Sequence, residues 1–476
     1  MPDLAQQSSL RLPAVKQDTR GRRRVDLRVV ITLALPLFVN SGIQALLNLT
    51  DTWFIGRIST DATAAVGASY WFVIVAILFF GGPGLAVQTL AAQAFGAGDN
   101  RSASRAAWAG VRGMLLVAPA FAIIAVLGPG LMGALNIEPR VAQLAAAYWF
   151  PRLLGGAFAV GIWATTGFFN GIGRTGTTLA LMTFVAVLNA VLNQVFIFKL
   201  GWGIAGSGWA TTAALGVGLL VSVALMLRRT IDGEFASRTT WRDSRAELRT
   251  LFRVGFPIGL FPAIDVAGLA AFQAMQVAAG AVDGAATQIV MMLTSIAYLP
   301  TMGFALAGTT LVGQSIGAGD KEWASKVGNT TIKLAVCYMG LVTVFLAVIG
   351  PWLVPLFVNA ADPHAASVIA LARTLLWFAA GYQIFDGLNL GAGFCLRGAG
   401  DMRVPTLTII FLSWFGFVPL THIFTFAPGQ GWVGFLPQLG YGAIGGWAVA
   451  VVYCVALGSF IYLRWRSGAW RKINLR

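Results

Sequence analysis

Three acidic residues lie inside long apolar runs of the sequence and are its clearest candidates for chemistry. They are Asp51, Asp265 and Asp386, whereas the rest of the 18 Asp and Glu residues fall in tails, loops or the ends of apolar runs. An ionised acid inside a bilayer is costly and is by default a functional-site hypothesis. A carboxylate that takes up a proton or Na⁺, and loses it when water arrives, is what ion-coupled transport requires.

Polar side chains share helical faces with these acids or with one another. A spacing of three or four residues places side chains on one face of a helix. The residues placed in this way are Gln44 and Asn48 with Asp51; Tyr382, Gln383 and Asn389 with Asp386; Asn189 with Asn193; and Thr211 in the following run. Such faces either line a cavity or join helices through hydrogen bonds, and the sequence leaves both open.

The surroundings of the acids favour ion binding over catalysis. Asp265 follows Pro257 and Pro262, which should kink its helix and free backbone carbonyls. We place no Lys or Arg at comparable depth, although Asp51 is close enough to the end of its run to reach outward instead. His and Cys residues lack metal-site spacing and no catalytic constellation is present. We therefore predict neither an enzyme nor a bound cofactor.

The composition is that of a polytopic membrane protein. The chain is 57% hydrophobic and 11% charged, with a mean hydropathy of +0.75, and a soluble chain could not cover so much apolar side chain. At about 20 residues per span, twelve helical spans are expected. They run over residues 29–56, 63–95, 104–128, 141–170, 176–199, 206–228, 252–280, 285–316, 325–350, 366–396, 404–425 and 440–463.

The net charge of +15 could indicate nucleic-acid binding, but its distribution indicates membrane topology. With the N-terminus in the cytoplasm, 28 of the 33 Lys and Arg residues lie on the inner side, as the positive-inside rule requires. The five on the outer side are Arg57, Arg140, Arg152, Lys199 and Arg373. We predict a multi-pass protein of the plasma (inner) membrane, with both termini cytoplasmic and no nucleic-acid partner.

An internal repeat divides the chain. Pro36 in LALPLF matches Pro257 in VGFPIG, and QAFGAGDN at 93–100 matches QSIGAGDK at 314–321, both at an offset of 221. NGIGRTG at 170–176 matches RGAGDMR at 397–403 at an offset of 227. Equivalent positions are six spans apart, so the halves share one orientation, as in secondary transporters. The paired GAGD segments are interpreted as helix ends.

The repeat sets the predicted domain boundaries. A basic tail at 1–28, expected to be mobile, precedes an N-lobe at 29–228. A cytoplasmic linker at 229–251 leads to a C-lobe at 252–463, and a basic cytoplasmic tail at 464–476 follows. No GxxxxGK[ST] segment is present, which argues against a nucleotide-driven pump.

Together these motifs resemble the multidrug and toxic compound extrusion (MATE) family over about residues 28–465. The resemblance is carried by LALPLFVNSGIQALLNLTDTWFIG, the GAGD pair, Asn189 with Asn193 followed by GIAGSGWAT, the GFP…D pattern at Asp265, and YQIFDGLNLGAGFCLRGAGD. It implies two six-helix lobes and export of bulky organic cations or drugs, driven by inward Na⁺ or H⁺.

The resemblance also implies roles for individual residues. Asp51, Gln44, Asn189, Thr211, Asp265 and Asp386 occupy polar or acidic positions of the family, whereas Asn193 is an amide where several members have an aspartate. A proton-binding carboxylate pair in the N-lobe is therefore in doubt. Coupling is expected through Na⁺ at Asp265 and Asp386, or through H⁺ at Asp51 alone.

The expected substrate is a cationic, amphipathic small molecule, handled by a monomer embedded in membrane lipid. The alternative is a flippase for a lipid or lipid-linked precursor with the same architecture. Such a protein would line its cavity with Lys or Arg to hold pyrophosphate, and we place no such residue at mid-span.

Overall fold

The computed structural model describes residues 12–134, 138–358 and 363–475, and these residues are almost entirely helical. Within these ranges, eleven helices are long and apolar enough to cross a membrane, and α12, bent by 49° ahead of Pro300, makes a twelfth. This confirms the predicted all-helical polytopic fold. One of these twelve spans, Arg403–Thr425, is built from shorter elements. The other spans are formed by α2 (Leu27–Gly56), α3 (Thr60–Gly96), α4 (Asn100–Val126), α6 (Pro139–Gly171), α7 (Thr175–Asn193), α8 (Gly203–Met226), α11 (Leu248–Ala279), α12 (Ala281–Gly317), α13 (Lys321–Val348), α15 (Ala365–Ala399) and α18 (Gly442–Arg466).

Shorter elements complete or connect these helices. A π-helix, η1 (Gln194–Lys199), extends α7, and another, η4 (Phe411–Phe417), joins α16 (Arg403–Ile410) to α17 (Val418–Thr425) in one span. The remaining elements are α5 (Gly128–Ala134), α9 (Arg229–Phe235), α10 (Ser237–Thr240), η2 (Asp243–Arg245), α14 (Gly350–Leu353), η3 (Val354–Phe357) and η5 (Ala469–Lys472), with the strands β1 (Val15–Gln17) and β2 (Arg23–Val25).

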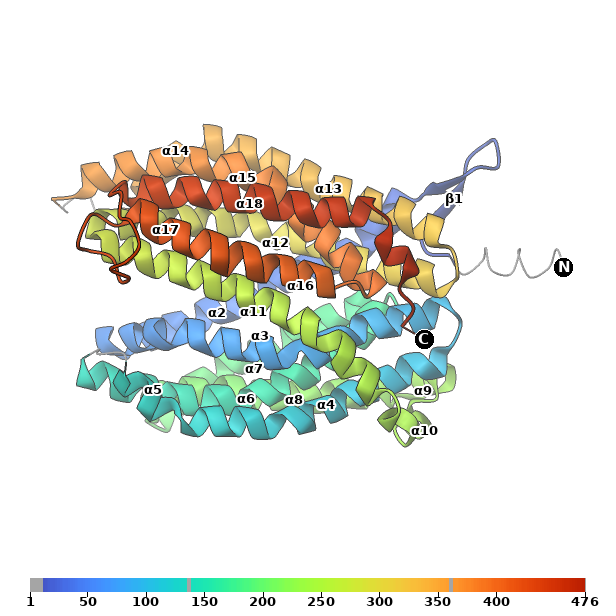
Figure 1. The fold of residues 1–476 in the computed structure, drawn as a ribbon. Coiled ribbons are helices and arrows are strands. Elements are labelled where there is room, and N and C mark those ends of the chain that lie inside the picture. The colour runs from blue at the N-terminus through green and yellow to red at the C-terminus, as the bar shows by residue number, and fades with distance from the viewer. Residues whose placement is uncertain (1–11, 135–137, 359–362, 476) are drawn as a thin grey trace.

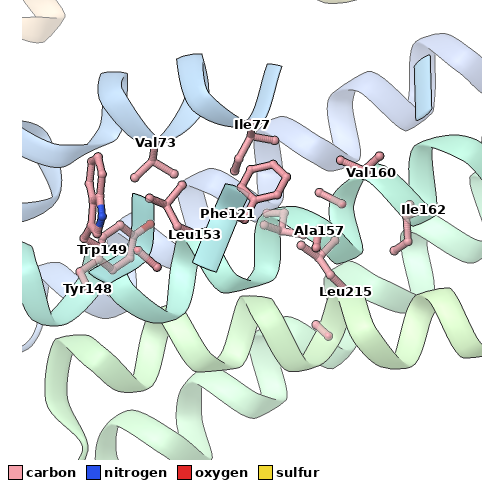
Figure 2. Close-up of a cluster of buried hydrophobic side chains, with 14 of the residues drawn as sticks. Val73, Ile77, Phe121, Tyr148, Trp149, Leu153, Ala157, Val160, Ile162 and Leu215 are labelled. Atoms are coloured by element: carbon pink, nitrogen blue, oxygen red, sulfur yellow. The ribbon is translucent and has the colours of Figure 1, made fainter. Parts of the chain in front are cut away.

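The two halves of the sequence form two bundles, seen one above the other in Figure 1. Each is built around one central helix: α6 contacts α3, α4 and α8, and α15 contacts α12, α13 and α18. Figure 2 shows the apolar core around α6, where Phe121 of α4 and Leu215 of α8 meet Leu153 and Val160. The end that carries β1, β2 and η5, here called the hairpin end, is on the right of Figure 1.

The halves meet through helix crossings that need glycine. A Cβ on Gly82 of α3 would overlap the carbonyl of Gly255 in α11. At the position of the repeat equivalent to Gly82, a Cβ on Gly303 of α12 would lie 2.8 Å from Phe38 of α2. Nearer the hairpin end, a Cβ on Gly96 would overlap the Gln314 carbonyl. Helices approach this closely only where side chains are absent.

The same symmetry governs hydrogen bonds between threonines of one half and the other half's backbone. Thr89 donates to the carbonyl of Arg397 at 2.9 Å. Its counterpart in the repeat, Thr310, donates to the carbonyl of Asn170 at 3.0 Å. Asn170 and Arg397 are themselves equivalent positions of the later repeat segment. The repeat detected in the sequence is therefore a repeat of contacts across the interface.

Two glutamines extend this pattern toward the hairpin end. Gln93 donates to the carbonyl of Gly398 at 2.9 Å, and Gln314 donates to that of Gly171 at 2.8 Å. The two glutamines are 221 residues apart and the two glycines 227 residues apart, which are the two offsets of the repeat. The halves are thus joined at the hairpin end by matched contacts from both sides.

The GAGD segments end α3 and α12, as predicted. Gly98 and Gly319 have φ of +73° and +84°, a conformation that favours glycine. Asp99 then accepts a hydrogen bond from the backbone of Ser102 and caps α4, and Asp320 caps α13 in the same way. The positive φ at the end of each helix therefore accounts for these glycines.

The segment 12–26 was expected to be part of a mobile tail, and that expectation is wrong. β1 and β2 pair in antiparallel register, and Ala14 is buried beside Trp323 of α13. The Trp323 indole donates to the Pro13 carbonyl at 2.9 Å, and Arg23 pairs with Asp320 at 3.3 Å. The hairpin therefore connects the start of α2 to the start of α13.

Arg397 also differs from expectation, because the predicted span 366–396 ends before it, whereas the helix continues through it here. It lies in α15, is 8% exposed, and donates from Nη2 to the carbonyl of Leu85 in α3 at 2.6 Å. Its guanidinium lies over the ring of Phe394 at 5.4 Å. A buried cation therefore takes part in the contact between the halves, where Asn170 is its symmetry counterpart.

The glycine crossing yields a stability prediction. Gly96→Ala should lower the thermal midpoint of the purified protein, because a methyl group there forces α3 away from α12, and overpacking of this kind costs about 1–3 kcal/mol. Gly67→Ala on the same helix is the matched control, since nothing lies within 4 Å of its added Cβ. Equal midpoints for the two variants in detergent would contradict the close crossing.

Candidate cation and substrate sites

Asp51 of α2 is buried and holds hydrogen bonds on both carboxylate oxygens. Its side chain is 6% exposed. Asn193 of α7 donates to Oδ1 at 2.6 Å, and Thr211 of α8 is placed to donate to Oδ2 at 3.0 Å. A buried carboxylate needs such donors, so Asp51 points into the N-terminal half and does not reach outward.

Asn189 completes this network. It donates from Nδ2 to the Thr211 hydroxyl at 3.1 Å and accepts from Asn193 at 3.1 Å. The four polar side chains predicted on three separate spans therefore meet at one point. Their hydrogen bonds join α2, α7 and α8 directly, so the amides hold the helices together as well as surrounding the acid.

A small cavity of about 60 Å³ lies beside Asp51. Asn48, Tyr70, Tyr148 and Arg152 line it together with Asp51. Arg152 was assigned to the outer side with no role, and no basic residue was expected at the depth of the acids. The structure corrects the second point, because α6 carries Arg152 to the same cavity as Asp51. Gln44 is exposed and does not line this cavity.

The C-terminal half contains a much larger cavity, of about 600 Å³. Asp265 of α11 and Asp386 of α15 both line it, with Tyr382, Gln383 and Asn389. The predicted polar face of α15 thus lies along a cavity, and the two acids, far apart in sequence, share one space. Asp265 is close enough for its charge to act on Asp386.

Aromatic rings form much of the wall of this cavity. Phe417 stacks on Tyr453 at 4.5 Å and on Phe272 at 5.5 Å, and Tyr382 stacks on Trp447 at 6.4 Å between ring centroids. Aromatic faces attract organic cations. The wall therefore suits a flat or quaternary cation with two carboxylates within reach.

Neutral oxygen atoms are also available around the acids. Tyr453 donates to Oδ1 of Asp265 at 3.0 Å. Among the described residues, the buried Asn389 Oδ1 and Gln273 Oε1 have no hydrogen-bond partner, and both residues line the cavity. Carboxylate and amide oxygens are ligands for hard cations. Within the described ranges no three His, Cys, Asp or Glu residues are grouped for metal binding.

Sequence reasoning missed Tyr453, Gln273 and Arg152. Tyr453 stands alone in the apolar run VVYCV of α18, without the polar neighbours that marked Asp386. Arg152 follows Arg140 in the same apolar run, and both were used only to count the Lys and Arg residues on each side of the membrane. Pro151 precedes it, and this proline in mid-helix was the one local signal of an unusual site.

The Asp51 network yields a prediction of non-additivity. Thr211→Val should lower the thermal midpoint, because a buried carboxylate that loses a donor costs about 1–3 kcal/mol. In an Asp51→Leu background the same change should cost much less, since the carboxylate is gone. Additive effects of the two changes on the midpoint would show that Thr211 does not stabilise Asp51.

Comparison with known proteins identifies the family of this fold. The MatE family model matches residues 36–195 and 264–421, one match in each half. The chain is 31% identical to a probable multidrug resistance protein NorM of Pseudomonas putida over 93% of this chain and 95% of that protein. It is 30% identical to the equally named protein of Mesorhizobium japonicum, over 86% and 90%.

Solved structures agree in fold. A structure described as the outward-facing conformation of a multidrug resistance MATE family transporter matches with a TM-score of 0.80 at 22% identity, covering 93% of this chain and 96% of that one. A superfamily transporter from Pyrococcus furiosus, described as having a binding pocket of reversed polarity, matches with a TM-score of 0.80 at 21% identity, over 93% and 96%. The chain belongs to the MatE family, the multidrug and toxic compound extrusion transporters.

Proposed function

We propose that this transporter exports amphipathic organic cations from the cytoplasm in exchange for Na⁺ or H⁺, by alternating access. Its family is one of transporters and not of enzymes. The observation that carries the proposal is the cavity of about 600 Å³, in which aromatic walls surround Asp265 and Asp386. An organic cation and a coupling ion would both be attracted to the same two carboxylates.

Exchange follows from the cost of charge in the membrane. Two acids in one cavity repel each other and are costly to leave ionised without a counter-charge. A coupling ion at Asp265 and Asp386 neutralises them, and so does an organic cation. Because the two ligands offset the same charge, binding of one favours loss of the other, which is the requirement for antiport.

Na⁺ is the coupling ion that the C-terminal cavity supports best. Asp265 and Asp386 supply anionic oxygens, and the unpartnered Oδ1 of Asn389 and Oε1 of Gln273 supply neutral ones. Coupling by H⁺ at Asp51 alone is the competing route. Asn193 stands where a second acid would make a proton-binding pair, and it donates to Asp51 instead.

The symmetric interface supports alternating access. Matched contacts of Gln93 and Gln314 join the halves at the hairpin end. This end opens when these equivalent contacts break. We place this end in the cytoplasm, because most Lys and Arg residues gather there. The transporter is expected to act as a monomer in the plasma membrane.

A flippase for a lipid or lipid-linked precursor is the alternative. It would hold pyrophosphate with basic side chains, and the described lining of the C-terminal cavity contains neither Lys nor Arg. Arg152 beside Asp51 is the one observation in its favour. A single arginine next to an acid is poorly suited to hold the negative charge of a pyrophosphate.

Reconstituted vesicles test the proposal. Ethidium should move against its gradient when an opposing Na⁺ or H⁺ gradient is imposed, and separate gradients identify the ion. Asp386→Asn and Asp265→Asn should each lower the driven flux at least about tenfold, as expected when a charge-assisted contact worth about 1.5–3 kcal/mol is lost. Glu322→Gln, an exposed acid on α13, is the matched control and should retain the flux.

Two results would contradict the proposal. Full driven efflux by both aspartate variants would show that these acids do not couple transport. Headgroup translocation without any ion gradient, and without ethidium movement, would support the flippase.

A further inference from the structure

Another cavity, of about 320 Å³, lies at the hairpin end, where the chain also ends (Figure 1). It is surrounded by α11, by the turn between α15 and α16, and by the C-terminal residues 473–475. Leu475 of this lining also packs on an apolar cluster formed mainly by α3, α4 and α6. The cavity therefore lies where the two halves meet, and its volume falls in the range of about 300–1,000 Å³ that is usual for ligand sites.

Two arginines line this cavity without a partner. Arg253 comes from α11, and Arg403 is the first residue of α16. Both are exposed, and among the described residues neither forms an ion pair within 4.0 Å. Like charges that share one cavity repel each other, and a bound anion would remove that cost.

The nearby acids do not neutralise these arginines. Asp401 is the one acidic residue in the described lining, and it is 2% exposed. Its Oδ2 accepts from Nε of Arg464 at 2.8 Å. Glu247, which precedes α11, pairs with Arg105 at 3.5 Å. The positive charge of the lining is therefore available to a ligand.

The repeat does not require these arginines. At the offsets of 221 and 227 residues, their counterparts in the N-terminal half are Thr32 for Arg253 and Gly176 for Arg403. The frame that the two halves share is thus built without a positive charge at the equivalent positions. The two arginines are a feature of one half alone.

The start of α16 adds hydrogen-bond donors to the cavity. Met402 lies before this helix and gives it no side-chain cap, so the first backbone N–H groups and the positive end of the helix dipole favour an anion. The Thr250 hydroxyl is also in the lining. Because a guanidinium fork matches the oxygens of a phosphate, this set of groups suits a phosphate ester.

Apolar groups beside the arginines indicate that the phosphate belongs to a lipid. Val254 and Leu475 line the cavity itself. Leu407 and Phe411 follow Arg403 at intervals of four residues, on the same face, and are 56% and 61% exposed. This exposed apolar row leads from the cavity along the span, as acyl chains would. We place the hairpin end in the cytoplasm, where the membrane surface carries anionic lipid.

We propose that this cavity binds the headgroup of an anionic phospholipid from the cytoplasmic leaflet. Arg253 and Arg403 hold the phosphate oxygens, and the acyl chains lie along Leu407 and Phe411. The lining shares no residue with the cavities of Asp51 and Asp265, so the lipid is a bound ligand and not a transported substrate. It joins α11 to the C-terminal segment.

Native mass spectrometry of the purified protein tests this site. Phosphatidylglycerol and phosphatidylcholine with the same acyl chains are titrated separately, and the parent should bind one phosphatidylglycerol roughly tenfold or more tightly than phosphatidylcholine. Arg253→Gln and Arg403→Gln should each weaken phosphatidylglycerol binding about tenfold, the loss expected for a charge-assisted contact. Thr250→Glu should weaken it as well, because it places an acid in the lining and leaves both arginines intact.

Arg249→Gln is the matched control, because Arg249 is exposed on α11 one turn before Arg253 and does not line the cavity. It should leave phosphatidylglycerol binding unchanged. An equal loss in Arg249→Gln would show attraction to general surface charge and overturn the proposal. Equal binding of the two lipids by the parent would overturn it too.

Inorganic phosphate is the third probe and separates a lipid site from a site for free phosphate. Millimolar inorganic phosphate should not raise the thermal midpoint of the parent, whereas phosphatidylglycerol should. A rise with inorganic phosphate that Arg253→Gln abolishes, together with no effect of phosphatidylglycerol, would overturn the lipid assignment. These measurements need no transport, so the site and the proposed export can fail separately.

Discussion

A carboxylate removed from water must be matched by donors or by a positive charge, and this structure depends on how it meets that requirement. In the N-terminal half, Asn193 and Thr211 hold the two oxygens of Asp51 with neutral donors, so this acid is already part of the packing. In the C-terminal half, Asp265 and Asp386 share a cavity in which Tyr453 donates to one oxygen of Asp265. The first arrangement suits a fixed structural acid that a nearby charge can adjust. The second leaves a charge for mobile ligands to neutralise.

The repeat explains why the two halves meet through matched contacts and yet differ in chemistry. The interface uses equivalent residues on both sides, such as Gln93 and Gln314, because equivalent helices must cross at equivalent distances. The acids obey no such constraint. The repeat places Phe272 opposite Asp51, and this ring stacks in the aromatic wall of the C-terminal cavity. It places Gln44 opposite Asp265. A symmetric frame thus carries an asymmetric pair of sites.

Much of this arrangement could be predicted from the sequence, because hydropathy and helical spacing are local signals. They placed the spans, the repeat, and the polar faces that meet at Asp51 and at Asp386. Contacts set by packing were out of reach. No local signal predicted that Tyr453 would reach Asp265 or that Pro13 would accept a hydrogen bond from the distant Trp323. Arg152 had been counted as an outer charge, and Pro151 alone hinted at the unusual site that it forms beside Asp51. The hairpin was taken for a mobile tail because its stability comes from that distant indole.

Ion release on drug binding tests the central claim most directly. Ethidium would be titrated into the purified protein in weakly buffered solution, while a pH-sensitive dye and a Na⁺-selective indicator follow the two ions. If the organic cation and the coupling ion offset the same carboxylates, binding of each ethidium should release about one H⁺ or Na⁺, and raising that ion should weaken ethidium binding reciprocally. Saturable binding that releases neither ion, with an affinity independent of both Na⁺ and pH, would contradict the account.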